Sequence, residues 1–126
     1  MAETETARYP YPTAVTAYGA GGFRFADMSH RGSILCLPSG IYAWQAASAE
    51  VIDVDALAPV LAEAGAIEIF LLGTGAAQVF PSREVRAACS EAGLGVEAMT
   101  TGAAARTYNV LLAEGRAVAA ALIAVS

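Results

Sequence analysis

The segment Ile67-Glu68-Ile69-Phe70-Leu71-Leu72-Gly73-Thr74-Gly75 is the most informative part of the sequence for the fold class. Its first six residues are apolar except for Glu68, and a run of this kind is typical of a parallel strand that is buried on both faces. Glycine and threonine follow at once, which indicates that the strand ends in a tight loop. Because a buried parallel strand needs neighbouring strands and covering helices, the stretch predicts an α/β domain.

Helices and strands alternate on the C-terminal side of this stretch. Ser82 and Thr101 are the predicted N-caps of two helices, each of which ends at a glycine. The short apolar segments at residues 96–99 and 118–125 are predicted strands. This alternation favours a parallel core for the sheet.

A further helix is predicted on the N-terminal side. Apolar residues recur there at helical spacing, namely Leu57, Val60, Leu61 and Ala64. Asp53 and Asp55 are both candidate caps. Pro59 favours Asp55, because proline is best tolerated in the first helical turn. Gly65 is the expected end of the helix.

The first half of the chain is richer in strands. Alternating or apolar segments predict strands at residues 15–19, 23–25, 33–37 and 41–46, the last two around the turn Pro38-Ser39-Gly40. Residues 27–31 are expected to form a polar loop. The expected fold is α/β, with a mixed sheet that has a parallel core, helices packed on it and an N-terminal β-hairpin region. Residues 1–14 are expected to be a flexible segment, and residues 15–126 a single domain.

Composition narrows the possible functions. The chain has 126 residues, which fits one domain. It has seven arginines, no lysine and twelve acidic residues, with a net charge of −5. Nucleic-acid binding needs a basic surface, so we expect no nucleic-acid partner.

The apolar segments, the first residues and the cysteines indicate where in the cell the protein is expected. Residues 32–49 are 18 residues without a charge, but a Pro-Ser-Gly turn in their middle favours two strands over a membrane span. The acidic start of the chain lacks the apolar core of a signal peptide. Cys36, Cys89 and the single histidine, His30, form no disulfide or zinc pattern. We therefore expect a cytoplasmic protein without a metal or cofactor.

Two glycine–threonine loops are the candidate ligand site. They comprise Gly73, Thr74 and Gly75 after one strand, and Thr100, Thr101 and Gly102 after the next. Ligands collect at the carboxyl ends of parallel strands. A helix that starts at the second loop would favour an anion, and Arg106 lies one turn further along. The same residue types are also good loop and cap residues, so a purely structural role is the competing interpretation.

The remaining reactive side chains give no catalytic arrangement. His30 is expected either to lie at the surface or to pin a loop, although a general base beside Asp27 is an alternative. Cys36 and Cys89 are expected in the core. Tyr42 and Trp44 share a strand face, and they either line a groove or fill the core. No nucleophile–base pair and no pair of carboxylates is visible, so we expect no catalytic residues. The sequence therefore favours a protein that is not an enzyme.

The order of several motifs resembles one small protein family. The matching segments are residues 18–25, 30–35, 37–40 with Trp44, 72–75 and 99–111. The family contains the mitochondrial NADH dehydrogenase (complex I) assembly factor 3 and the adipogenesis-associated Mth-type domain protein. The absence of lysine and the 30 alanines suggest a bacterial member from a GC-rich genome.

The resemblance implies a single three-layer α/β domain with a central mixed sheet. It also implies a non-enzymatic role in assembling a respiratory or other membrane complex through protein–protein contacts. Such a role places the protein in the cytoplasm, with the periphery of the inner membrane as a further location. The family's recurrent loop residues extend the candidate cleft to Asn109. The resemblance implies no catalytic residue in this chain.

Three functional hypotheses follow. The first is an assembly or chaperone-like factor that docks on respiratory or membrane-complex subunits. The second is a protein that binds a small anionic ligand, or an enzyme, and uses the cleft at the strand ends with Arg106. The third is a homo-oligomeric module, because few charges keep its surfaces apart.

Overall fold

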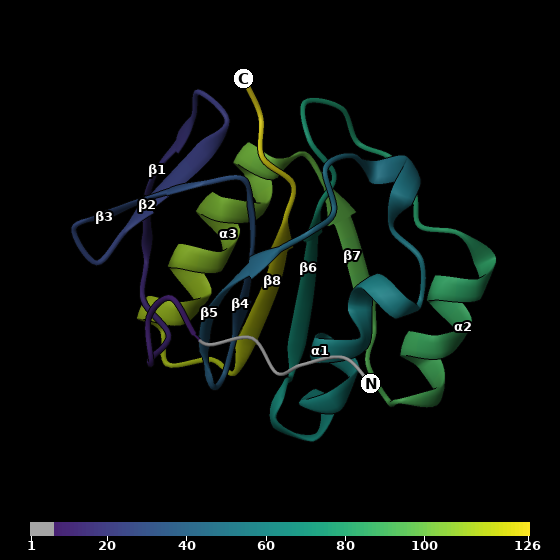
Figure 1. Ribbon diagram of the computed structural model, residues 1–126. Coiled ribbons are helices and arrows are strands. Elements are labelled where there is room, and N and C mark those ends of the chain that lie inside the picture. Colours follow the sequence, from purple (N-terminus) through teal and green to yellow (C-terminus); the bar gives the residue numbers. More distant parts are fainter. Residues whose placement is uncertain (1–6) are drawn as a thin grey trace.

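The computed structural model describes residues 7–126, which form two β-sheets and their covering helices (Figure 1). The larger sheet has five strands in the order β5-β4-β8-β6-β7. Its strands are β4 Ser33–Leu37, β5 Gly40–Trp44, β6 Ile69–Gly73, β7 Val96–Met99 and β8 Val118–Leu122. The apolar segment at residues 67–72 therefore provides a strand next to the centre of the sheet.

The larger sheet is mixed and has a parallel part, as predicted. Strands β8, β6 and β7 run parallel. Strand β4 runs antiparallel to both β5 and β8, so most of the uncharged residues 32–49 form a strand pair, as expected. In the described residues, no helix is long and apolar enough to cross a membrane.

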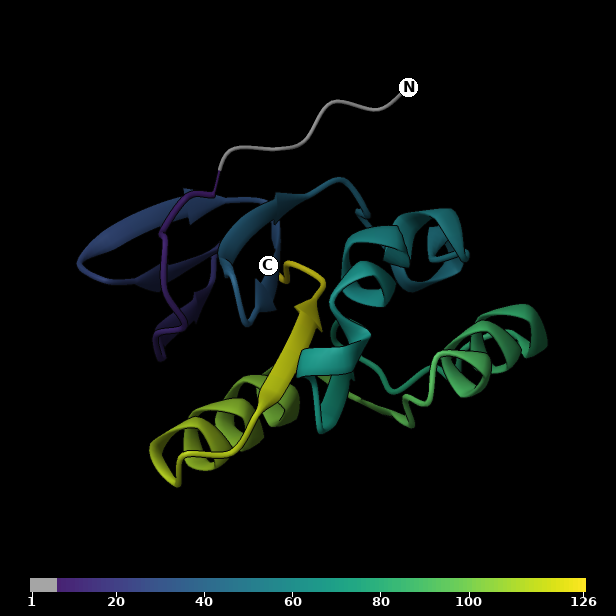
Figure 2. The ribbon, with the colours of Figure 1, turned by 90° about the horizontal axis from the view of Figure 1, so that it is seen from below.

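Helices cover both faces of this sheet, and alternate residues of β6 divide the core into two halves (Figure 2). Phe70 and Leu72 belong to the cluster that also contains Val85 and Cys89 of α2 Arg83–Glu91 and Val60 of α1 Ala58–Ala62. Leu71 belongs to the opposite cluster, together with Ala104, Ala105 and Tyr108 of α3 Thr101–Ala113. The side chains of a strand alternate between its faces, so one apolar run serves both halves.

The second sheet is a three-stranded antiparallel meander, in the order β1-β2-β3. Its strands are β1 Val15–Gly19, β2 Gly22–Phe25 and β3 Met28–Arg31. Val15, Phe23 and Phe25 pack into the cluster under α3. The meander and α3 thus form one layer, the large sheet the second, and α1 and α2 the third, which confirms the expected three-layer α/β fold.

The predicted polar loop at residues 27–31 is wrong, because β3 occupies it. The turn lies one step earlier, at Ala26 and Asp27, whose φ angles are +50° and +61°. Ser29 and Arg31 face solvent on the outer side of the meander. The polar composition of this strand therefore reflects a sheet with one exposed face.

The predicted helix before Gly65 is shorter and less regular than expected. The segment forms three 3₁₀ turns around the five-residue helix α1, namely η1 Ala49–Val51, η2 Asp55–Leu57 and η3 Ala64–Ala66. The carboxylate of Asp53, rather than that of Asp55, accepts a hydrogen bond from the N–H of Ala56, at 2.8 Å. Pro59 has no backbone N–H to donate, and Gly65 destabilises a helix because it loses more conformational entropy than other residues. A longer regular helix therefore does not form here.

The two longer helices have the expected ends, with one shift of register. The Ser82 hydroxyl accepts the N–H of Val85 at 3.2 Å, and Gly93 follows α2 with φ of +75°. Helix α3 begins one residue earlier than predicted, because Thr100 is its N-cap and accepts from the N–H of Ala103 at 3.3 Å. The hydroxyl of Thr101 therefore does not cap the helix and instead makes buried hydrogen bonds, which are described below.

Part of the N-terminal segment is tied to the sheet. Of the segment expected to be flexible, residues 1–6 lie outside the described residues. The N–H groups of Arg8 and Tyr9 donate to the carbonyl of Ile41 at 2.7 and 3.3 Å, and the Tyr9 carbonyl accepts from Ile41 at 2.9 Å. These bonds attach the chain before β1 to the edge strand β5.

Candidate functional site

The structure brings the two glycine–threonine loops side by side, because β6 and β7, which they follow, are neighbours in the sheet. The N–H of Thr74 donates to the carbonyl of Met99 at 2.9 Å, and the N–H of Thr101 donates to the carbonyl of Gly75 at 2.9 Å. The loops therefore continue the pairing of β6 and β7 beyond the ends of these strands. Gly73, Thr74, Gly75, Thr100, Thr101 and Gly102 lie together at this edge.

The hydroxyl of Thr74 organises its own loop. It donates to the carbonyl of Ala77 at 2.6 Å, and the Met99 carbonyl lies 3.1 Å away. It also accepts the N–H of Val79 at 3.0 Å. The side chain is 5% exposed. The hydrogen-bonding positions of the Thr74 hydroxyl are thus occupied by backbone groups of the protein. These bonds hold the loop that leads to α2 in place.

The hydroxyl of Thr101 joins the loop to the last strand. It donates to the carbonyl of Ile123 at 2.7 Å and accepts the N–H of Gly75 at 2.9 Å. The residue is fully buried. One buried hydroxyl therefore satisfies one donor and one acceptor of the backbone, as buried polar groups require.

The glycines of these loops allow close packing. A Cβ atom on Gly73 would lie 2.9 Å from Cδ2 of Leu122 and 3.0 Å from Cα of Thr101. A Cβ atom on Gly102 would contact the hydroxyl of Tyr18 and lie 3.0 Å from Cζ of its ring. The first residues of α3 therefore lie directly against the sheet and the meander.

Arg106 and Asn109 of α3 both face the meander. Arg106 Nη1 donates to the hydroxyl of Tyr18 at 3.3 Å and lies over Gly102. Asn109 accepts the N–H of Val15 and donates to its carbonyl. Arg106 thus bonds to Tyr18 of β1 over the start of its helix, and Asn109 bonds to β1 further along.

A hollow opens on the other side of the Thr74 loop, against the 3₁₀ turn η1. It has a volume of about 200 Å³ and is lined by Leu72, Thr74, Ala49, Glu50, Ile52 and residues 79–82. Large apolar side chains stand exposed around it: Phe80 is 77% exposed, Val51 55% and Val79 37%. These residues were not predicted as functional from the sequence. The signal that could have found them is the pair Val79-Phe80 directly before Pro81 in a loop.

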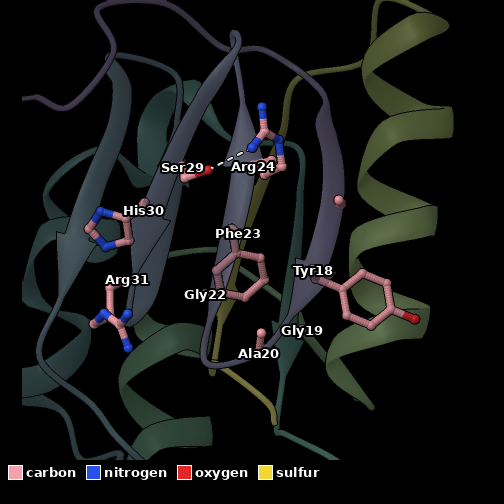
Figure 3. A pocket seen from close by; sticks show the side chains of 10 residues that line it. Tyr18, Gly19, Ala20, Gly22, Phe23, Arg24, Ser29, His30 and Arg31 are labelled. Carbon is pink, nitrogen blue, oxygen red and sulfur yellow. Dashed lines mark hydrogen bonds between the residues drawn. The ribbon is translucent and has the colours of Figure 1, made fainter.

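A second hollow, of about 590 Å³, lies on the meander (Figure 3). Its lining includes Tyr18, Gly22, Arg24, Ser29 and Arg31. Arg24 Nη1 donates to the hydroxyl of Ser29 on the neighbouring strand at 2.8 Å. This hollow was not predicted from the sequence, because the polar residues Ser29 and Arg31 are typical of a loop.

The other candidate side chains have structural positions. His30 is 8% exposed in β3, and its Nε2 lies 3.3 Å from the carbonyl of Ser33. Burial lowers the pKa of His30, and the charge of Arg8 acts in the same direction. His30 thus joins β3 to β4 across the turn at Gly32. It lies in a strand rather than in a loop, and the expected surface position is wrong because the residue is buried.

The two cysteines and Trp44 belong to the core, and Tyr42 is half-buried beside it. Burial raises the pKa of Cys36 to about 12 and also raises the pKa of Cys89. A thiol with such a pKa is a poor nucleophile. Trp44 is 8% exposed and donates from Nε1 to the carbonyl of Ala56 at 2.9 Å. Tyr42 Oη lies 2.6 Å from the hydroxyl of Ser39.

Comparison with known proteins shows which family the chain belongs to. Residues 15–123 match the model of a family described as a protein of unknown function (DUF498/DUF598). NADH dehydrogenase [ubiquinone] 1 alpha subcomplex assembly factor 3 of Danio rerio is 33% identical over 111 residues, which are 88% of this chain and 64% of that protein.

Solved structures agree with the fold. A structure described as an outer membrane protein from Bartonella henselae is 49% identical and superposes with a TM-score of 0.91, covering 94% of this chain and 100% of that one. A Bordetella pertussis protein described as a Mth938-like domain is 32% identical, with a TM-score of 0.79 over 98% of this chain and 92% of that one. The resemblance drawn from the sequence motifs is thereby confirmed, and the chain belongs to the DUF498/DUF598 family, which also includes relatives named as complex I assembly factors.

Proposed function

We propose that this protein is a non-enzymatic, chaperone-like assembly factor that acts through protein–protein contacts. Its partners would be subunits of NADH dehydrogenase (complex I) or of another membrane complex. The names of the zebrafish and mouse relatives support this role. Its place of action would be the cytoplasm and the periphery of the inner membrane.

The observation that carries the proposal is the exposed loop of Val79 and Phe80. Phe80 leaves 77% of its surface in water although the loop is fixed by the Thr74 hydroxyl. Aromatic side chains beside a small hollow are typical anchors of protein interfaces. A loop of this kind presents an apolar anchor without first having to be ordered, which lowers the entropic cost of binding.

A small anionic ligand at the two glycine–threonine loops has less support. The hydroxyls of Thr74 and Thr101 are both engaged with backbone groups. Arg106 bonds to Tyr18. Neither Thr101 nor Arg106 lines one of the two hollows described above.

Quantitative affinity capture tests the proposal. The tagged full-length protein is expressed in the organism that encodes it, and captured proteins are measured by mass spectrometry. We expect subunits of a respiratory or other membrane complex, with recovery at least fivefold lower for Phe80→Ser. The control is Val110→Ser, which changes an apolar side chain that is 57% exposed on α3 and should leave recovery within twofold.

Two results would contradict the proposal. One is a deletion strain with normal levels of complex I and of its assembly intermediates, combined with a capture that recovers no membrane-complex subunit. The other is an equal loss of recovery in both variants, which would show that Phe80 is not the anchor.

A further inference from the structure

Charge is divided unevenly along this acidic chain. Residues 7–49 contain three arginines and a single acid, Asp27, whereas residues 50–126 contain nine acids and four arginines. The first part therefore has a net charge of +2 and the second a net charge of −5. The positive charges of the first part are Arg24 and Arg31 in the meander and Arg8 before it, since residues 33–44 of the β4–β5 hairpin carry no charge.

The strand register gathers this basic charge on one face. Ala17 pairs with Arg24 and Arg24 with Ser29, while Gly19 pairs with Gly22 and Gly22 with Arg31. Paired residues of antiparallel strands share a face, so these six residues form the outer face of the meander. Four of them are glycine, alanine or serine, and the other two are arginines. We call this surface the arginine platform.

The two guanidinium groups are available to a ligand. Arg24 and Arg31 are exposed and line the hollow of about 590 Å³. Within residues 7–126, the salt bridge found is the one between Glu68 and Arg116, so neither platform arginine is paired with an acid there. Arg24 is held in place by the hydroxyl of Ser29, as Figure 3 shows. A partly ordered guanidinium loses less conformational freedom when it binds a carboxylate.

The spacing of the two arginines indicates the kind of ligand. Arg31 is two residues beyond Ser29, the partner of Arg24, so the arginines occupy diagonal positions, about 7–8 Å apart in a regular sheet. Alternate side chains of an extended peptide, which point to the same side, are about 7 Å apart. Half of the lining residues are glycine, alanine or serine, and Tyr18 and Phe23 are the apolar side chains among the rest, so the site is an open surface rather than an enclosed cavity.

We propose that the arginine platform binds an extended acidic segment of a partner protein, with carboxylates at alternate positions, one for each arginine. The site is separate from the Phe80 loop, and the proposal stands whether or not that loop binds a partner. Charge complementarity selects this occupant, because Arg24 and Arg31 are exposed, neither has an acidic partner within residues 7–126, and carboxylates supply the opposite charge.

Fluorescence anisotropy with a labelled octapeptide tests the inference. The peptide has glutamates at its third and fifth positions and small polar residues elsewhere. Two matched peptides have glutamines at these positions, or glutamates at the third and fourth. The full chain should bind the first peptide saturably at low salt, and at least fivefold more tightly than either matched peptide.

Charge-matched variants provide the control. Arg24→Gln/Arg31→Gln should weaken binding at least tenfold, and Arg31→Gln alone should weaken it at least threefold. Arg83→Gln/Arg86→Gln removes the same charge from two exposed arginines of α2 and should change the affinity by less than twofold. Phe80→Ser should leave the affinity unchanged.

Three outcomes would overturn the inference. The first is no saturable binding of the first peptide at about 1 mM. The second is an equal loss of affinity in the two double variants, which would show non-specific charge attraction. The third is binding of inorganic pyrophosphate, seen by thermal shift and lost in Arg24→Gln/Arg31→Gln, without binding of the peptide, because the occupant would then be a phosphate compound.

Discussion

The side-chain amide of Asn109 in α3 makes both backbone hydrogen bonds of Val15 in β1. Its Oδ1 accepts from the Val15 N–H at 2.8 Å, and its Nδ2 donates to the Val15 carbonyl at 2.7 Å. Asn109 thus takes the place of a neighbouring strand at the outer edge of β1, and it joins the meander to the helix that covers the large sheet.

Asn109→Ala should lower the free energy of unfolding by about 1–3 kcal/mol, because two partly buried backbone groups lose their partners. Urea denaturation measures this change. Hydrogen exchange should also speed up in β1 more than in β6. An unchanged rate of hydrogen exchange in β1 would show that the Asn109 side chain does not hold this strand in place. Asn109→Asp keeps the acceptor but not the donor, so its effect should be intermediate.

Gly73→Ala should destabilise the protein by about 1–3 kcal/mol, because the new methyl group meets Leu122 and the backbone of Thr101. The matched change is Gly95→Ala, where no atom lies within 4 Å of the added Cβ. Its effect should stay within about 0.5 kcal/mol. Thermal and urea unfolding compare the two. Equal effects would mean that the α3 start does not pack as tightly as described.

The buried hydroxyl of Thr101 offers an isosteric test. Thr101→Val keeps the shape but leaves the Gly75 N–H and the Ile123 carbonyl without their partner. We expect a loss of about 1–3 kcal/mol in the free energy of unfolding. Thr101→Ser keeps the hydroxyl and should cost less. A neutral valine variant would contradict the assigned bonds.

The stability of the protein should fall as pH falls below about 6.5, the ordinary pKa of histidine. Burial lowers the pKa of His30 in the folded state, so the unfolded chain binds the proton more readily, and acid favours unfolding. The free energy of unfolding at pH 7.5 and at pH 5.5 should therefore differ more for the native sequence than for His30→Gln. Equal differences would show that another group is responsible.

The fold could be predicted from the sequence where apolar residues dominate. Residues 67–72 and 118–125 show buried strands because both of their faces are covered. Strand β3 could not be recognised, because only His30 and part of Met28 face inward, and a polar strand resembles a loop. The helix around Pro59 was predicted too long, since spacing alone does not show how proline and glycine divide a helix.

The candidate site could be predicted only in its location. The order of strands and loops places Thr74 and Thr101 at one edge, and the structure has them there. The direction in which a hydroxyl points depends on backbone groups distant in sequence, such as the Ile123 carbonyl, and no local pattern encodes it. Phe80 was missed for a similar reason, because exposure of an apolar residue is a property of the folded surface.

The position of β8 has a consequence for how the protein is made. This strand is formed by residues 118–122 and lies between β4, from the first third of the chain, and β6. During synthesis, the β4–β5 hairpin and the β6–β7 unit leave the ribosome first, and neither can pair with the other. The five-stranded sheet closes only when β8 emerges and inserts between them. Until then both units expose apolar edges, so the nascent chain is vulnerable to aggregation for most of its translation.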